Sequence, residues 1–422
     1  MYNTANQLLN ILNNKSVTYF IGDKVRDDIV HPTNKKKKKY NSISLISSLS
    51  QDDLHYLFKN SKKYDDYILI NFGLYEFKIY SFRFINDINL SDRQKNNIIL
   101  ESLNYIREKK DFTINILIMD QNEEIIDFNF KYKNHKVSCL NDIKNNLIRI
   151  IGNPKNKIKN DPILILKAFN LMSNLNYEIE KNTLAAIDKY KELLQNLDKS
   201  IIIEEFNKIL KGKNIGKTIK LMFDLGFFEL KIEHKYNFFS FIKNNQILKN
   251  VMKLNRYNKI TLIEIYTVIF KDKYDLIDKN LKTINILNDE DIEKVKWLVK
   301  NFNLLEFKNK ELRLNIYNNT KNELIFNKKM PILKDLLNKL VNIHLLLGSK
   351  IKRNDIMFAL CSRPYFYEQL KISDQDICKL YYKKYNDNCK NLNEIKNKIL
   401  YELIIANKYP NHNLIEFIYN II

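Results

Sequence analysis

The spacing of apolar residues changes near residue 139, and this change constrains the fold more than any other feature. Before it, short apolar runs alternate with polar residues or stop at turn residues, which is typical of strands. After it, apolar residues recur every three or four positions, which is typical of amphipathic helices. Only 7 glycines and 6 prolines occur in 422 residues, and this scarcity favours long helices with few tight turns.

The first part reads as an α+β domain with a small mixed sheet. Strands are predicted at 17–21, 42–48, 67–70, 77–82, 114–119 and 125–130. The last two form a hairpin, and a turn at 71–73 joins the third and fourth strands. Helices are predicted at 2–14, with Leu8, Leu9, Ile11 and Leu12 as its apolar face, and at 51–59 and 92–109.

The remainder reads as all-α, with helices predicted at 161–175, 181–194, 202–210 and 215–225 and a helical pattern to the end. Hydrophobic residues make up 45% of the chain, enough for more than one core. We predict a head domain over residues 1–138, a helical neck over 139–230, and a helical body and tail over 231–422.

The chain is strongly basic, with 70 Lys and Arg against 49 Asp and Glu and a formal charge of +21. Such a charge attracts polyanions, of which RNA is the usual one. Drift in an AT-rich genome also enriches Lys, Asn and Ile, so the charge alone is weak support. The lysine run Lys35, Lys36, Lys37, Lys38 and Lys39 is open to both interpretations, as an RNA-phosphate contact or as a solvated loop.

The cysteines and histidines do not predict a metal site. The four cysteines include no C-x-x-C pair, and the six histidines show no metal-ligand spacing. Reduced thiols, no membrane-spanning run and no secretory signal at the start indicate a cytoplasmic protein, or one from a reduced bacterial or organelle-like compartment.

Five sequence blocks carry a resemblance to a known family. Tyr19–Asp27 (YFIGDKVRD) joins a strand to a helix through a glycine turn, an arrangement that can hold a triphosphate. Downstream blocks follow in fixed order, at Lys109–Asn115 (KKDFTIN), Leu147–Pro154 (LIRIIGNP), Asn160–Ala168 (NDPILILKA) and Lys217–Leu230. Together they resemble class II CCA-adding tRNA nucleotidyltransferases and bacterial poly(A) polymerases, over about residues 5–230.

The resemblance implies nucleotidyl transfer by two metal ions, held by a D-x-D pair on one strand and an acid on a neighbouring strand. At these positions the chain has Ser42, Ser44 and Lys78. Neutral hydroxyls bind Mg²⁺ far less well than carboxylates do. We therefore predict no catalytic residues, no bound metal and no cofactor, in a degenerate member of the family. The adjacent pairs Asp52–Asp53 and Asp65–Asp66 diverge in direction and are poor substitutes.

Other family positions are partly kept. The base-reading arginine position is Leu164, and Asp23 replaces a glycine and adds negative charge where phosphates would lie. By resemblance, the residues left for nucleotide or phosphate binding are Gly22, Arg26, Lys109, Lys110, Asp111, Asn115 and Asp161. Arg26 fits equally a structural role with Asp27, and Asp111 and Asn115 are expected to support the turn and hairpin.

Aromatic residues in the last third have two interpretations. Tyr365–Tyr367 and the group Tyr381, Tyr382 and Tyr385 lie among lysines and could stack on bases, but a helical core in a Tyr-rich chain looks the same. We favour core for them, and for the single tryptophan, Trp297.

The leading functional hypothesis is an RNA-binding protein or assembly subunit with an inert head, whose partner is tRNA or a ribonucleoprotein. The first alternative is an active RNA 3′-end nucleotidyltransferase with Mg²⁺ held by carboxylates from elsewhere. The second is a structural subunit of a larger complex with no free RNA ligand.

Overall fold

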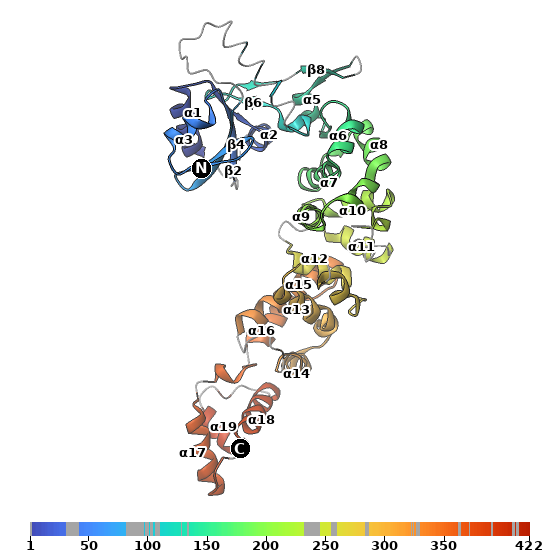
Figure 1. The fold of residues 1–422 in the computed structure, drawn as a ribbon. Helices are drawn as coiled ribbons and strands as arrows, with labels where there is room; N and C mark the ends of the chain where they lie inside the picture. Colours follow the sequence, from blue (N-terminus) through green and yellow to red (C-terminus); the bar gives the residue numbers. More distant parts are fainter. Residues whose placement is uncertain are drawn as a thin grey trace. The chain divides into compact units, whose positions relative to one another are not determined.

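The chain divides after Glu205. A computed structural model places Met1–Glu205 in one unit and Phe206–Ile422 in another, and each is described by itself (Figure 1). The residues that the structure describes are 2–30, 42–81, 97, 101, 104–105, 110–127, 129–132, 135–231, 245–254, 260–282, 287–321, 323, 325, 330–361, 364–370, 372–389, 391–406, 410 and 413–422.

The first unit is built on a mixed sheet of seven strands in the order β3-β4-β5-β2-β1-β6-β7. Only β2 and β5 run parallel, and the other neighbours in this sheet are antiparallel. The strands are β1 (Thr18–Ile21), β2 (Ser42–Ser47), β3 (Lys62–Lys63), β4 (Tyr67–Phe72), β5 (Tyr75–Ser81), β6 (Ile118–Met119) and β7 (Ile125–Ile126).

Helices α1 (Tyr2–Asn13) and α3 (Gln51–Leu57) pack on this sheet, against β1 and β4 respectively (Figure 1). The α1 face is apolar, and Leu8, Leu9 and Leu12 are fully buried. Helix α3 begins where the Ser50 hydroxyl accepts a hydrogen bond from the Asp53 amide. This N-cap satisfies an amide that the helix leaves without an internal partner. Helix α2 (Asp23–Val30) follows β1 directly.

Small elements and helices complete the first unit after the sheet. Strands β8 (Asn129–Tyr132) and β9 (His135–Ser138) form a short antiparallel hairpin. Strands β10 (Leu147–Ile148) and β11 (Glu178–Ile179) form a separate parallel pair. The helices are the 3₁₀ turn η2 (Thr113–Asn115), α5 (Cys139–Lys144), α6 (Pro154–Asn160), α7 (Leu164–Leu175), α8 (Lys181–Tyr190) and η3 (Lys191–Asn196). Helix α9 (Lys199–Leu210) runs from this unit into the next.

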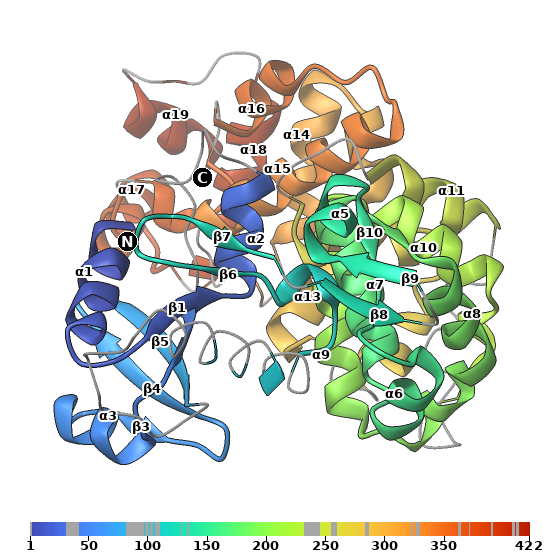
Figure 2. The same cartoon turned by 90° about the horizontal axis from the view of Figure 1, so that it is seen from above.

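The second unit is helical throughout its described residues. It consists of α10 (Ile215–Asp224), η4 (Phe227–Glu229), α11 (Asn245–Lys253), α12 (Leu262–Phe270), the π-helix η7 (Asp278–Lys282), α13 (Asp289–Lys300), η8 (Phe302–Glu306), α14 (Asn309–Thr320), α15 (Met330–Leu347), α16 (Arg353–Cys361), η10 (Tyr367–Gln369), α17 (Asp374–Tyr385), α18 (Leu392–Ile405) and α19 (Leu414–Ile421). Helix α12 packs on α11, α13 and α15 (Figure 1), and α14 packs on α18 (Figure 2). None of the helices within the described ranges has the length and apolar character that a membrane crossing requires.

The α+β head followed by helices is confirmed, and most element predictions hold to within a few residues. Three details were wrong. The turn between β4 and β5 lies at Gly73 and Leu74 rather than at 71–73, because Gly73 takes the positive φ of 61° that a tight turn needs. The predicted 114–119 strand begins as the 3₁₀ turn η2, and Ile11 of α1 is 41% exposed rather than part of its apolar face. The predicted helix at 92–109 lies almost wholly outside the described residues.

Candidate functional site

Ser42 and Ser44 lie on one face of β2, as the sequence predicts. Both are half-buried, whereas Ile43 and Leu45, which alternate with them, are buried on the other face. Side chains alternate across a strand, so the two serines point to the same, less covered face of the sheet. The strand that would present a D-x-D pair is therefore intact, with hydroxyls in place of carboxylates.

The parallel pairing of β2 with β5 places two charged residues beside the serines. Lys78 lies directly opposite Ser44, and Glu76 lies directly opposite Ser42. Directly opposed residues share a face of the sheet, and neighbouring strands are about 4.8 Å apart. The face that carries the serines thus has one lysine and one glutamate on the neighbouring strand.

Two lysines of this face rest on tyrosine rings. The Lys78 Nζ lies 5.4 Å from the centre of the Tyr67 ring, and the Lys110 Nζ lies 4.5 Å from the centre of the Tyr80 ring. Tyr67 and Tyr80 pair across β4 and β5, with their ring centres 5.5 Å apart. Cation–π contacts of this kind hold an ammonium group in place without neutralising its charge.

Lys110 is the more enclosed of the two lysines. Burial lowers the pKa of its ammonium group, and the charges of Lys78 and Lys167 act in the same direction, against Asp23 and Asp111. Burial also raises the pKa of the Tyr80 hydroxyl to about 12. Lys110, a candidate for phosphate binding by resemblance, is half-buried, with its ammonium group over the Tyr80 ring.

The glycine turn and the start of α2 bring Asp23 and Arg26 to the edge of this face. Gly22 has φ 75°, a conformation that side chains with a Cβ rarely adopt, and it lets the chain turn from β1 into α2. The Arg26 guanidinium donates to Asp23 at 2.9 Å, to Asp27 at 3.1 and 3.2 Å, and to the Asn115 side chain at 2.8 Å.

Arg26 and Asp27 are 5% and 4% exposed. Burial opposes the charge of Arg26, but Asp23 and Asp27 outweigh it, and the pKa of Arg26 lies above its ordinary value. Of the two roles considered for Arg26, the geometry favours the structural one, which ties α2 to the η2 turn. Its pairing with Asp23 also offsets the negative charge that Asp23 was expected to present to phosphates.

Lys167 connects the two acids of the family motifs. Its Nζ lies 3.0 Å from an Asp111 carboxylate oxygen and 3.8 Å from an Asp161 carboxylate oxygen. Asp111 therefore supports the fold through α7, and Asn115 does so through α2, rather than through the hairpin as expected. Asp111 accepts a hydrogen bond from Lys167, and Asn115 accepts one from Arg26.

Leu164 is 1% exposed at the beginning of α7. A side chain at this position is part of the core. It cannot form hydrogen bonds with the edge of a base, whereas an arginine in the aligned family motif would do so by resemblance.

The residues on this face do not fit the two-metal set that the resemblance implies. Glu76 is the single carboxylate paired with the serine-bearing strand, and Lys78 occupies the next position on the same face. Within the ranges that the structure describes, no three Asp, Glu, His or Cys residues come together in a way that could hold a metal ion. The active alternative requires two acids near Ser42 and Ser44, and the described strands provide one.

Several predicted site residues lie elsewhere. Lys109 and the run Lys35–Lys39 fall outside the described residues. Asp52 and Asp53 serve α3, where Asp52 pairs with Lys63 and Asp53 with the Ser50 cap. In the second unit Trp297, Tyr365 and Phe366 are core, as favoured, but Tyr382 and Tyr385 are 55% and 50% exposed.

Sequence reasoning missed Glu76, Tyr67 and Tyr80 as parts of this face. The signal exists in the alternation of β4 and β5, whose half-exposed residues include all three. Using it requires the order and register of the strands, which local patterns do not provide.

The chain is similar in sequence to one family model and to several CCA-adding enzymes. The model of a family described as "Probable RNA and SrmB-binding site of polymerase A" matches residues 176–232. The CCA-adding enzyme of Bacillus velezensis is 26% identical over 211 residues, which are 49% of this chain and 50% of that enzyme. That of Staphylococcus epidermidis is 23% identical over 303 residues, 71% of this chain and 68% of that enzyme. The chain thus spans about half the length of most of the curated relatives it matches.

Solved structures show the same fold. The Thermotoga maritima CCA-adding enzyme complexed with tRNA superposes with a TM-score of 0.62 and 16% identity, covering 98% of this chain and 95% of that one. The Bacillus stearothermophilus CCA-adding enzyme in complex with CTP gives a TM-score of 0.62 and 13% identity, covering 96% and 92%. The partial sequence matches make the chain similar to CCA-adding enzymes and to a polymerase A RNA-binding family, and the solved structures show that it has the fold of CCA-adding enzymes.

Proposed function

We propose that this protein binds RNA, with tRNA as the first candidate, and that its head does not transfer nucleotides. The observation that supports the lack of nucleotide transfer is the position of Lys78, directly opposite Ser44 on the serine-bearing face. RNA binding is supported by the similarity to CCA-adding enzymes, by the net charge of +21 and by the matched segment at residues 176–232.

The charge of Lys78 opposes a divalent ion at the serines more strongly than the serines can favour it. A unit charge about 7 Å from a divalent ion costs on the order of 5 kcal/mol at an effective dielectric constant of 20. Hydroxyl ligands offer no compensating negative charge, and Glu76 provides one carboxylate where two metals require several. Without the metals, the triphosphate and the leaving pyrophosphate have no divalent cation to neutralise them.

The remaining cations of the site are largely committed to the protein itself. Arg26 is bonded to Asp23, Asp27 and Asn115, and Lys167 is paired with Asp111 and Asp161. These bonds stabilise the head and its junction with α7. They support a scaffold that keeps the family fold, which is what a binding protein with a non-catalytic head requires.

The proposal is tested by two measurements on the purified full chain. The first is incorporation of labelled CTP and ATP into tRNA that lacks its CCA end, with Mg²⁺ or Mn²⁺, beside the Thermotoga maritima enzyme as positive control. The second is binding of the same tRNA across a range of salt concentrations. We expect no incorporation, together with binding that weakens steeply as salt rises.

The two claims, RNA binding and the lack of nucleotide transfer, would be overturned by different results. Metal-dependent incorporation by the natural protein would overturn the non-catalytic head. Failure to bind tRNA at low salt, by a protein that melts cooperatively, would overturn the RNA-binding half and favour a purely structural subunit.

A further inference from the structure

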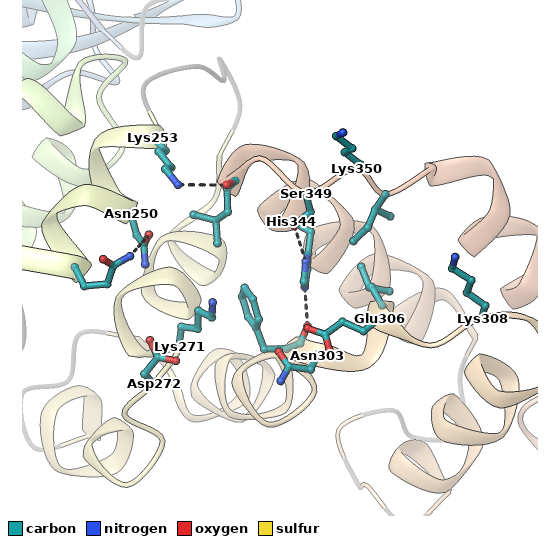
Figure 3. A pocket seen from close by; sticks show the side chains of 15 residues that line it. Asn250, Lys253, Lys271, Asp272, Asn303, Glu306, Lys308, His344, Ser349 and Lys350 are labelled. Atoms are coloured by element: carbon teal, nitrogen blue, oxygen red, sulfur yellow. Dashed lines mark hydrogen bonds between the residues drawn. The ribbon is translucent and has the colours of Figure 1, made fainter.

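A second site lies far from the serine-bearing face in the chain, within the second unit. A cavity of about 620 Å³ opens between α11, α12, η8 and the end of α15 (Figure 3). Its volume falls in the range of small-molecule sites, about 300–1,000 Å³. Four lysines line it, at positions 253, 271, 308 and 350.

The four lysines come from four different elements. Lys253 is the last residue of α11, Lys271 caps the end of α12, Lys308 precedes α14, and Lys350 follows the Gly348 turn after α15. Figure 3 shows them placed around the cavity. Because residues up to 97 positions apart (350 − 253) converge on one cavity, their approach is a property of the fold and not of a local lysine run.

These lysines keep their charge available. The Lys253 Nζ donates to the Leu347 carbonyl at 3.3 Å, and the Lys271 Nζ lies 4.5 Å above the Phe302 ring. Lys308 and Lys350 are exposed. Within the described part of the unit, none of the four is paired with a carboxylate. Two acids, Asp272 and Glu306, also line the cavity and are exposed, so positive groups outnumber negative ones by four to two.

The cavity wall is held in place by His344. Its Nε2 lies 2.6 Å from the Phe302 carbonyl oxygen and its Nδ1 lies 3.3 Å from the Ser349 hydroxyl (Figure 3). The rings of Phe302 and His344 are 4.6 Å apart. These contacts fix η8 against the end of α15. A preformed wall reduces the ordering cost of binding.

Apolar and polar groups lie beside the charges. Leu305, Leu347 and Ile351 give the cavity an apolar side, and the buried Asn250 and exposed Gln246 give it an amide side. A ligand that suits this lining has a phosphate for the lysines and a largely uncharged part of nucleotide size for the rest.

We propose that this cavity binds a nucleotide, whose phosphate is attracted by the lysines around the cavity and whose sugar and base lie along the apolar and amide sides. The nucleotide is either free or an unpaired residue of an RNA. The inference goes beyond the proposed function, because it concerns a different unit and holds whether or not the head transfers nucleotides.

The test uses the full-length protein and the paired variant Lys308→Ala/Lys350→Ala, chosen because both side chains are exposed and their loss leaves the core intact. The matched control is Lys310→Ala/Lys334→Ala, which removes the same charge from exposed positions of α14 and α15 that do not line the cavity. Binding of AMP, adenosine, inorganic phosphate and a single-stranded RNA is measured by calorimetry. A Lys271→Gln variant, with its melting temperature, is a second probe from inside the cavity.

We expect the cavity variants to weaken AMP binding about tenfold or more and the control pair to change it less than twofold. Adenosine should bind more weakly than AMP, because it lacks the phosphate. An equal loss for AMP and RNA identifies either source as a ligand, a loss confined to AMP identifies the free nucleotide, and a loss confined to RNA identifies an unpaired RNA residue. Equal affinity of the natural protein, cavity variants and control for AMP and RNA alike would overturn the site.

Discussion

Lys78 lies directly opposite Ser44 where β5 runs parallel to β2. By resemblance to the family motif, Ser44 stands where a carboxylate would lie, and Lys78 stands at the facing position of β5 in place of a further acid. The two changes act together, because restoring an acid at position 44 alone would create a Lys–Asp pair across the strands rather than a metal ligand. The cation–π contact with Tyr67 holds the Lys78 ammonium group on the less covered face of the sheet.

Removal of Arg26 is predicted to destabilise the head. Arg26→Ala removes the ion pair that the buried guanidinium makes with the Asp27 carboxylate, which is 4% exposed. Breaking a buried ion pair from one side costs about 3–5 kcal/mol of unfolding free energy. Urea unfolding measures this loss. The control Lys63→Ala breaks the exposed pair with Asp52 and should cost under about 1 kcal/mol. Equal effects of the two variants would contradict a structural role for Arg26.

Restoring an arginine at position 164 is predicted to fail. Leu164 is 1% exposed, so Leu164→Arg buries a guanidinium in the core of α7. We expect a loss of roughly 3 kcal/mol or more in unfolding free energy and no gain in discrimination between CTP and ATP. Thermal melting and nucleotide competition check both. A stable variant that discriminates between the two nucleotides would show that this position faces the site.

The second unit is predicted to lose stability in mild acid because of His344. Burial lowers its pKa below the ordinary 6.5, against the hydrogen bond to Phe302. As pH falls below about 6.5 the unfolded chain takes up this proton before the folded chain does, so unfolding free energy falls with pH in that window. In denaturation experiments at several pH values, the unfolding free energy of His344→Gln should fall less steeply with decreasing pH than that of the natural protein. Identical slopes would contradict this assignment.

The sequence predicts local features of the site well and non-local features poorly. The alternation of Ser42 and Ser44 follows from a period of two within one strand, and the N-cap of α3 fixes where that strand ends. The position of Lys78 as a replaced acid came from a motif. Its contact with Tyr67, and the presence of Glu76 opposite Ser42, depend on the pairing of three strands.

The same limit explains what was missed elsewhere. Leu164 was identified as a lost arginine, but its burial depends on how α7 packs. The lysines of the second cavity belong to four elements, so no window of sequence shows their convergence. The contacts of Arg26 with Asn115 and of Asp111 with Lys167 likewise join residues 89 and 56 positions apart.

We propose that Lys78 and the two serines leave the head unable to hold a divalent metal, and a Mn²⁺ titration followed by electron paramagnetic resonance measures this directly. The comparison uses the natural protein, Ser42→Asp/Ser44→Asp, and the same pair with Lys78→Glu. We predict no saturable Mn²⁺ binding by the natural protein, weak binding by the double variant, and at least tenfold tighter binding by the triple variant, since it removes the opposing ammonium and adds a ligand. Saturable Mn²⁺ binding by the natural protein, or equal affinity of the double and triple variants, would contradict the account.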